Sequence, residues 1–252
     1  MPTAYRRALG AILAVGVTIG FALPTFAKGH PGRRAAQPPN PPLYATRAYQ
    51  GSQHLKHFEG LAKAHPKSLV DQFEAGVAAF QNHLPQASIR YYSACLRLDS
   101  HFGQAANDIG NVYVELLKSP AKAVRYYQEA IRLSPKYLVA YLQLANAYTD
   151  MGKPALAVNA YKAALKVAPS FTIADYYVAT EYQTALKNPK LAIIYYKRTL
   201  KLQRNFDSAW LGLAQTYGQM KDTAEMRATA REALKVLPKN DPLRPQLAKL
   251  AK

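Results

Sequence analysis

Small and aromatic side chains recur at a nearly constant interval between residues 76 and 235. The small residues follow one another after 34, 35, 34 and 35 positions, and a Tyr stands three residues after four of them. The small residues are Gly76, Gly110, Ala145, Ala179 and Ala214, and the Tyr residues are Tyr113, Tyr148, Tyr182 and Tyr217. A period of about 34 residues is typical of a repeated helical hairpin. The pattern therefore predicts five hairpins, in which small residues let a first and a second helix approach closely.

The unit at residues 138–171 shows the most complete pattern. Its first helix holds Leu144, Ala145 and Tyr148, its second helix holds Ala157, Tyr161 and Ala164, and Pro169 closes it. This pattern resembles the tetratricopeptide repeat family. The resemblance implies an all-α, right-handed solenoid of about five hairpins, whose work is binding rather than catalysis. Stacked neighbours bury the apolar face of each hairpin, so the end units need polar caps.

The repeat divides the chain into segments with expected bounds. The five units are expected at residues 69–102, 103–137, 138–171, 172–206 and 207–240. A lone helix at about 46–64, within a capping segment at 46–68, is expected to cover the first hairpin. Residues 241–252 are expected to form a short C-terminal capping helix, with Asp241 as its N-cap and Pro242 in its first turn.

The second and fourth units carry one more residue between their helices than the third and fifth units do. The two turns read Leu-Lys-Ser-Pro at 117–120 and Leu-Lys-Asn-Pro at 186–189. Ser119 or Asn188 is expected to cap the second helix, and the Pro to occupy its first position, where a missing N–H is tolerated.

The first 27 residues are typical of an export signal. Arg6 and Arg7 precede an uncharged run from Ala8 to Ala22, and small residues follow before Lys28. We expect residues 1–27 to be removed, residues 28–45 to form a Pro-rich linker, and the protein to reside in the periplasm of a bacterium. The alternative is an uncleaved segment that anchors the chain in the inner membrane, because the run reaches about 20 residues when it is extended to residue 27.

The chain is strongly basic, with a formal net charge of +18, and the cations follow the repeat. One series stands late in each second helix, and a second series stands four residues earlier on the same face. Together they are Arg97, Arg132, Lys162, Lys166, Lys197, Lys201, Arg231 and Lys235. The resemblance implies that this cationic stripe lies on the convex side of the solenoid. It is either a solvated face or a surface that binds an anionic polymer or membrane, and export argues against nucleic acid.

The inner face of tetratricopeptide stacks is lined mainly by the first helices, and here those positions are mostly uncharged. The residues expected to line this groove are Phe73, Asn107, Asn111, Asn146, Tyr176, Thr180, Gln183 and Gln215. The Lys and Arg with which chaperone-binding members clamp a terminal carboxylate are absent. Amides can instead pair with an extended peptide, while Phe73 and Tyr176 offer apolar pockets. Alternatively, Asn111 and Asn146 only join neighbouring helices by hydrogen bonds.

The sequence contains no motif that supports catalysis. It lacks a Gly-rich phosphate loop, a nucleophile motif and a repeated carboxylate pair, so we expect neither an enzyme nor a cofactor. His54 and His57 share a helix face, but no metal is expected because surface histidines are far commoner than ligands. Cys95 takes a small-residue position and is expected to be buried, with an intermolecular disulfide as the alternative. The sequence thus predicts an envelope scaffold for a protein or peptide partner, and leaves self-association open.

Overall fold

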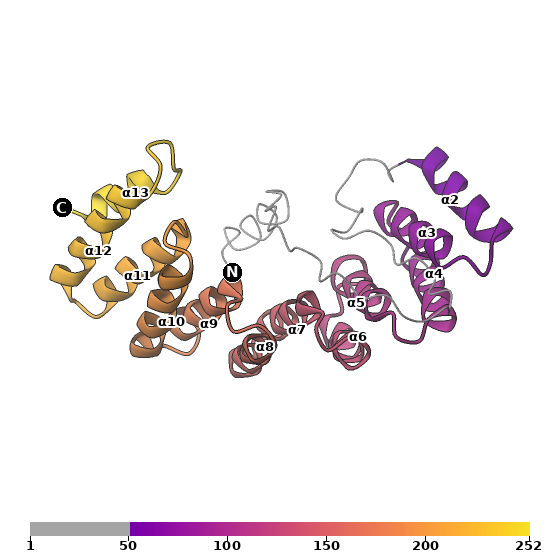
Figure 1. Ribbon diagram of the computed structural model, residues 1–252, viewed down its shortest axis with the longest axis horizontal. Coiled ribbons are helices and arrows are strands. Elements are labelled where there is room, and N and C mark those ends of the chain that lie inside the picture. The colour runs from indigo at the N-terminus through magenta and orange to yellow at the C-terminus, as the bar shows by residue number, and fades with distance from the viewer. Residues whose placement is uncertain (1–50) are drawn as a thin grey trace, which may run out of the picture. The chain divides into compact units, whose positions relative to one another are not determined.

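The computed structural model describes residues 51–252, which belong to two compact units. The first unit ends at Asp99, and the second comprises Ser100–Lys252. Helices are the only regular elements of the described residues, and they form antiparallel hairpins (Figure 1). The predicted all-α solenoid of helical hairpins is therefore confirmed. The predicted export signal at residues 1–27 and the linker at 28–45 lie outside the described residues.

The first unit contains a single helix followed by one hairpin. Its helices are α2 (Ser52–Ala64), α3 (Leu69–Gln81) and α4 (Pro85–Leu98). Helix α2 contacts α3, where Nε2 of Gln72 donates a hydrogen bond of 2.7 Å to the carbonyl oxygen of Ala62. Between α3 and α4, the ring centroids of Phe73 and Tyr92 lie 5.5 Å apart. Cys95 is fully buried on α4, as the sequence predicts.

The second unit stacks four hairpins and a short terminal helix. Its first helices are α5 (Gly103–Asn111) with its π-helical continuation η3 (Val112–Leu116), α7 (Leu138–Asp150), α9 (Thr172–Thr184) and α11 (Asp207–Gln219). Its second helices are α6 (Pro120–Leu133), α8 (Pro154–Val167), α10 (Pro189–Leu202) and α12 (Thr223–Val236), and α13 (Arg244–Leu250) ends the chain. Each helix contacts the next one along the chain, so the hairpins form one continuous stack.

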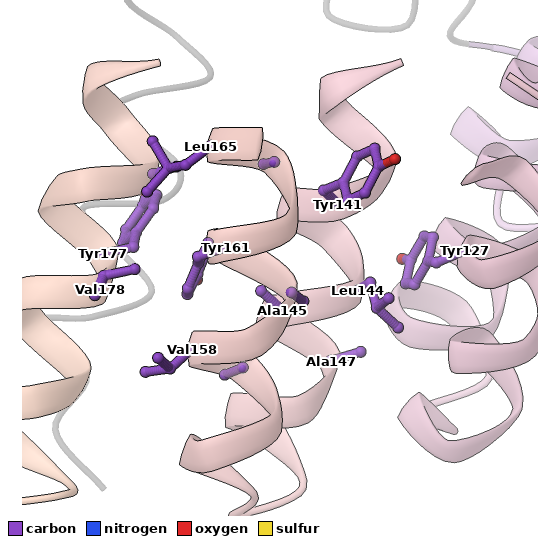
Figure 2. Packing of buried hydrophobic residues seen from close by; sticks show 14 of the residues in the cluster. Tyr127, Tyr141, Leu144, Ala145, Ala147, Val158, Tyr161, Leu165, Tyr177 and Val178 are labelled. Atoms are coloured by element: carbon purple, nitrogen blue, oxygen red, sulfur yellow. The ribbon is translucent and has the colours of Figure 1, made fainter. Parts of the chain in front are cut away.

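In the first four hairpins, a Tyr of the second helix fills the space that the small residue of the first helix leaves open. A Cβ atom added to Gly110 would lie 2.5 Å from the ring of Tyr127, so only Gly is small enough for this position. Tyr161 is fully buried in the next hairpin, beside Ala145 (Figure 2). Its ring stacks on that of Tyr177 in α9, with the ring centroids 5.3 Å apart. The repeated small residues and tyrosines thus build both the hairpins and the contacts between them.

The turn within each hairpin contains one residue in the left-handed conformation. The five residues are His83, Lys118, Gly152, Lys187 and Lys221. In the second and fourth hairpins the additional residue is taken up by a wider turn at the end of the first helix. There the N–H of Leu117 donates to the carbonyl oxygen of Val112, five residues earlier, and Leu186 makes the same bond.

Two of the predicted caps are corrected by the structure. Asn188 caps α10, since its Oδ1 accepts a hydrogen bond of 3.1 Å from the N–H of Leu191, but the side chain of Ser119 makes no such bond to α6. At the C-terminus, Oδ1 of Asp241 accepts from the N–H of Leu243 in a tight turn, and α13 begins only at Arg244. The guanidinium of Arg244 donates to two carbonyl oxygens near the end of α12, which satisfies groups that a helix end leaves open.

Candidate binding surfaces

The second unit has two layers of helices, one made by its first helices and the other by its second helices. Helices α6 and α8 lie below α5 and α7 in Figure 1. Consecutive first helices also contact one another, α5 with α7 and α9 with α11. Side chains of the first helices that point away from the second helices therefore share one face. We call this face of α5, α7, α9 and α11 the first-helix face.

The predicted groove residues differ widely in their exposure. Phe73 and Asn107 are buried, with 1% and 0% of their surface exposed, so the prediction that they line a groove is wrong. Asn111, Thr180 and Gln183 are at most 8% exposed. Asn146 and Tyr176 are half-buried, and Gln215 is exposed. The buried side chains pack within and between hairpins. The repeat in the sequence could not reveal this, because core positions and groove positions share one period.

The amides of the first helices hold the tyrosines of the second helices. Oδ1 of Asn111 accepts a hydrogen bond of 2.9 Å from the hydroxyl of Tyr127, and Oδ1 of Asn146 accepts one of 2.7 Å from Tyr161. In the fourth repeat, Oε1 of Gln183 accepts from the corresponding tyrosine at 2.7 Å. Asn111 and Asn146 therefore join the two helices of their hairpins, as the alternative interpretation expects. By accepting from the buried hydroxyl, the amide oxygen avoids the free-energy cost of a buried donor without a partner.

The first helices carry only negative charge. Among the described helices, α3, α5 with η3, α7, α9 and α11 contain eight carboxylates and no Lys or Arg. The second helices α4, α6, α8, α10 and α12 contain fourteen Lys and Arg and three carboxylates. The interpretation of the groove as mostly uncharged missed this segregation, because it considered positions that hold amides and aromatics. Counting charge helix by helix would have found it.

Burial raises the pKa of Tyr127 well above its usual value, and the charges of three of these carboxylates raise it further. They belong to Asp108 and Glu115 in the second repeat and to Asp150 in the third. Asp108 is 2% exposed, whereas Glu115 and Asp150 reach solvent.

Asp108 is an unusual group to bury. Its Oδ1 accepts hydrogen bonds of 3.1 Å from the side-chain amides of Asn107 and Asn111. Among the described residues, its Oδ2 and the Oδ1 of Asn107 have no hydrogen-bond partner. Burial raises the pKa of Asp108 to about 7, the two amides lower it, and the charge of Glu115 raises it further.

Two more carboxylates of α9 are buried and hold the stack together. Asp175 is fully buried, and its Oδ2 lies 3.2 Å from Nε of Arg198 in α10. Burial raises the pKa of Asp175 to about 6, although the guanidinium of Arg198 acts in the opposite direction. Oε1 of Glu181 accepts a hydrogen bond of 2.6 Å from Thr149 in α7, and burial raises its pKa. The structural role of these acids could not be predicted from spacing.

Several members of the predicted cationic stripe are engaged within the stack. Nζ of Lys162 donates to the hydroxyl of Tyr182, the first-helix tyrosine of the next repeat, at 3.0 Å, and this bond raises the pKa of Lys162. Lys197 lies over the ring of Tyr217 at 5.6 Å. The remaining members, Arg97, Arg132, Lys166, Lys201, Arg231 and Lys235, are exposed. Among these, Arg132 pairs with a glutamate one turn earlier in its own helix.

Half-exposed apolar residues follow directly after three of the exposed cations. Leu98, Val167 and Leu202 are 40%, 39% and 46% exposed, next to Arg97, Lys166 and Lys201. A cavity of about 470 Å³ near the last of these has cations from α10 on one side and Glu225 and Glu232 on the other. Arg204 and Glu232 form an ion pair there.

None of the helices in residues 51–252 has the length and apolar character that a membrane span requires. A group of three or more His, Cys, Asp or Glu suited to a metal ion is also absent from this range.

Solved structures with the same fold are numerous and distant in sequence. A structure of MamA has 22% identity, covers 60% of this chain and 87% of its own, and gives a TM-score of 0.53. YrrB, described as a TPR protein with an unusual peptide-binding site, has 15% identity, covers 77% and 98%, and gives 0.57. The C-terminal part of a TPR repeat-containing protein from Cytophaga hutchinsonii has 15% identity, covers 77% and 76%, and gives 0.64.

The sequence comparisons identify the repeat itself. A search of curated proteins finds no match. Three sequence models, each described as tetratricopeptide repeat, match residues 73–137, 139–171 and 207–240, which together make up about half of the chain. The chain therefore belongs to the tetratricopeptide repeat family.

Proposed function

We propose that the protein is a non-catalytic scaffold of the cell envelope that holds a peptide or protein partner on the first-helix face. One observation carries this proposal: consecutive first helices present solvent-reaching polar and aromatic groups on one side. Asp150, Thr184 and Gln215 are exposed there, and Tyr176 is half-buried. Extended peptides are recognised by such combinations of polar groups and apolar pockets. The unusual peptide-binding site described for YrrB supports the same use of the fold.

The envelope location rests on the first 27 residues of the sequence. A basic start, an uncharged run and small residues before Lys28 are what export requires. The alternative, an uncleaved anchor in the inner membrane, places the repeats in the same compartment. N-terminal sequencing of the protein purified from its source distinguishes the two, since cleavage gives a chain that begins at Lys28.

Photo-crosslinking from defined positions tests the proposed face. A photoreactive phenylalanine is placed at Thr184 or Gln215 on the first-helix face, and at Lys166 or Lys201 on the second helices as matched exposed controls. After illumination in cells, we expect one discrete protein adduct from the first pair, identified by mass spectrometry. Adducts from Lys166 and Lys201 alone would refute the proposed face.

A second candidate function is attachment to an anionic membrane or polymer through the second helices. It is favoured by the exposed cations that precede half-exposed apolar residues, as in Lys166-Val167 and Lys201-Leu202. Such pairs combine charge attraction with apolar contact at a lipid surface. Flotation with vesicles of anionic lipid tests it: K166E/K201E should abolish binding, whereas T184A/Q215A should leave it unchanged.

A further inference from the structure

The cavity between α10 and the last hairpin has an apolar floor and charged walls. Trp210, Leu213 and Tyr217 of α11 form the floor, and their side chains are buried. On the α12 wall, Ala228 and Thr229 leave the middle of the cavity without a large side chain. The volume of about 470 Å³ lies within the range of about 300–1,000 Å³ that ligand-binding cavities have.

Two other hairpins carry an aromatic ring at the place that Thr229 takes in the last one. In the second hairpin, the ring of Tyr126 stacks on that of Tyr113, with the ring centroids 5.2 Å apart. In the fourth hairpin, Tyr195 stacks on Tyr182 with the centroids 6.0 Å apart. A second-helix tyrosine thus covers the first-helix tyrosine of its own hairpin.

The last hairpin lacks this covering ring. Tyr217 stands in frame with Tyr113 and Tyr182, but its counterpart on α12 is Thr229, and α12 contains no aromatic residue. Both Tyr217 and Thr229 line the cavity, so the space that a second-helix ring would take is part of it. A ring supplied from outside can therefore complete the pair that two other hairpins complete by themselves.

From this geometry we propose that the cavity receives an aromatic side chain of a partner protein, next to an acidic residue of that partner. The ring would lie beside Tyr217 and Trp210, where Thr229 leaves room for it. Stacked aromatic rings attract each other beyond the apolar area that they bury. The cavity lies on the side of the second helices, so this contact is separate from the one proposed for the first-helix face.

The charges on the walls explain why an acidic neighbour fits. Three cations line the α10 side and two carboxylates line the α12 side: Lys197, Lys201, Arg204, Glu225 and Glu232. Arg204 pairs with Glu232, and Nζ of Lys197 lies over the ring of Tyr217. Within residues 51–252, Lys201 makes no ion pair. A carboxylate beside the bound ring can therefore pair with Lys201.

A protein side chain fits the cavity better than a lipid surface does. Glu225 and Glu232 stand on one wall, and they would repel the head groups of anionic lipids. A single ring with one neighbouring carboxylate reaches the floor beside Tyr217 and meets Lys201 on the opposite wall.

Trp210 provides the signal for the test, because it is the single Trp of the chain and lines the cavity. The full chain is titrated to millimolar concentration with three capped peptides, Ala-Glu-Phe-Glu-Ala, Ala-Glu-Ala-Glu-Ala and Ala-Lys-Phe-Lys-Ala. We expect the first peptide to change the fluorescence of Trp210 with saturation, the second to have no effect, and the third to bind more weakly. K201Q should weaken binding of the first peptide about two- to fivefold, whereas K166Q, at an exposed position of α8, should not.

Two variants fill the cavity with side chains that α10 has at the same places. T229Y introduces the counterpart of Tyr195, and A228I introduces the counterpart of Ile194. Each should weaken binding of the Phe peptide at least about tenfold, because its side chain occupies the space beside Tyr217. N159Y adds a tyrosine at an exposed position of α8 and should leave the affinity unchanged. Circular dichroism verifies that the variants are folded, and A228I decides the matter if T229Y is not.

Several results would overturn the proposal. They are the absence of a fluorescence change with the Phe peptide, equal binding of the peptides with and without Phe, and unchanged binding in the folded cavity variants. Phenylacetate that binds as tightly as the Phe peptide would assign the cavity to a small aromatic acid. Self-association of the free chain that A228I abolishes, seen by sedimentation, would assign it to a second copy.

Discussion

Replacing Asp108 by Asn should stabilise the protein at neutral and alkaline pH. Burial raises the pKa of this carboxyl to about 7 in the folded chain, whereas an unfolded chain has a pKa near 4. The folded state therefore holds its proton more tightly between about pH 4 and pH 7. Stability falls as the pH rises through this interval, because an ionised Asp108 lacks the water that solvates it after unfolding.

The size of the effect follows from the difference in pKa. About three units correspond to about 4 kcal/mol between the two protonation states, and this difference is fully expressed above about pH 7. Asn has nearly the shape of a protonated Asp, and its Oδ1 can keep both bonds from Asn107 and Asn111. The stability of D108N relative to the natural chain should thus grow from near zero at pH 4 toward this limit at pH 8.

Urea unfolding followed by circular dichroism, repeated from pH 4 to pH 8, measures the difference. E225Q makes the same change of charge at an exposed position in α12 and should leave the pH dependence unaltered. A difference between D108N and the natural chain that stays constant with pH would refute the argument. So would a loss of stability in D108N at pH 8, because it would mean that the ionised carboxylate is favourable in its site.

Two packing predictions concern the repeated core. G110A should destabilise the chain by about 1–3 kcal/mol, because the new Cβ would meet the ring of Tyr127, whereas G60A in exposed α2 should stabilise it by about 0.5–1 kcal/mol. If G110A and G60A changed the thermal unfolding temperature equally, helix propensity alone would determine the stability of both variants. Y161F should cost about 1 kcal/mol by removing the hydroxyl that donates to Asn146, and an unchanged urea midpoint would contradict this role.

The hairpins could be predicted from the sequence because their core repeats in phase. A small residue in the first helix and a Tyr in the second occur together in the first four hairpins, as Gly110 and Tyr127 do, because each fills the space left by the other. The helix ends were less predictable. Ser119 and Asn188 stand at equivalent positions before a Pro, yet only Asn188 caps its helix. Such choices depend on side-chain geometry that the residue type does not fix.

The groove could be predicted only in part, because core and surface positions share one period. Asn107 and Tyr176 occupy the same place in two repeats, but Asn107 is buried and Tyr176 is half-buried. Three of the amides predicted to recognise a peptide, Asn111, Asn146 and Gln183, accept hydrogen bonds from buried tyrosines. Spacing identifies a helix face, whereas the size of its neighbours decides whether a side chain on that face reaches solvent.

The charge segregation follows from how a tandem repeat evolves under the constraint of its core. Core positions keep small residues in every unit and tyrosines in most units, so differences between units collect mainly at the remaining positions. Those positions hold Asp108, Glu115 and Asp150 on first helices, without a single Lys or Arg, while second helices collect cations such as Lys166 and Lys201. Stability alone does not demand this division, because exposed charges of either sign serve solubility equally well. Where a carboxylate is buried, this division even lowers the stability of the fold, since an ionised Asp108 loses the solvation that water would give it. Other buried acids join elements of the stack instead: Oδ2 of Asp175 lies 3.2 Å from Nε of Arg198, and Oε1 of Glu181 accepts a hydrogen bond of 2.6 Å from Thr149. A buried carboxylate is thus tolerated where the stack supplies it with a partner.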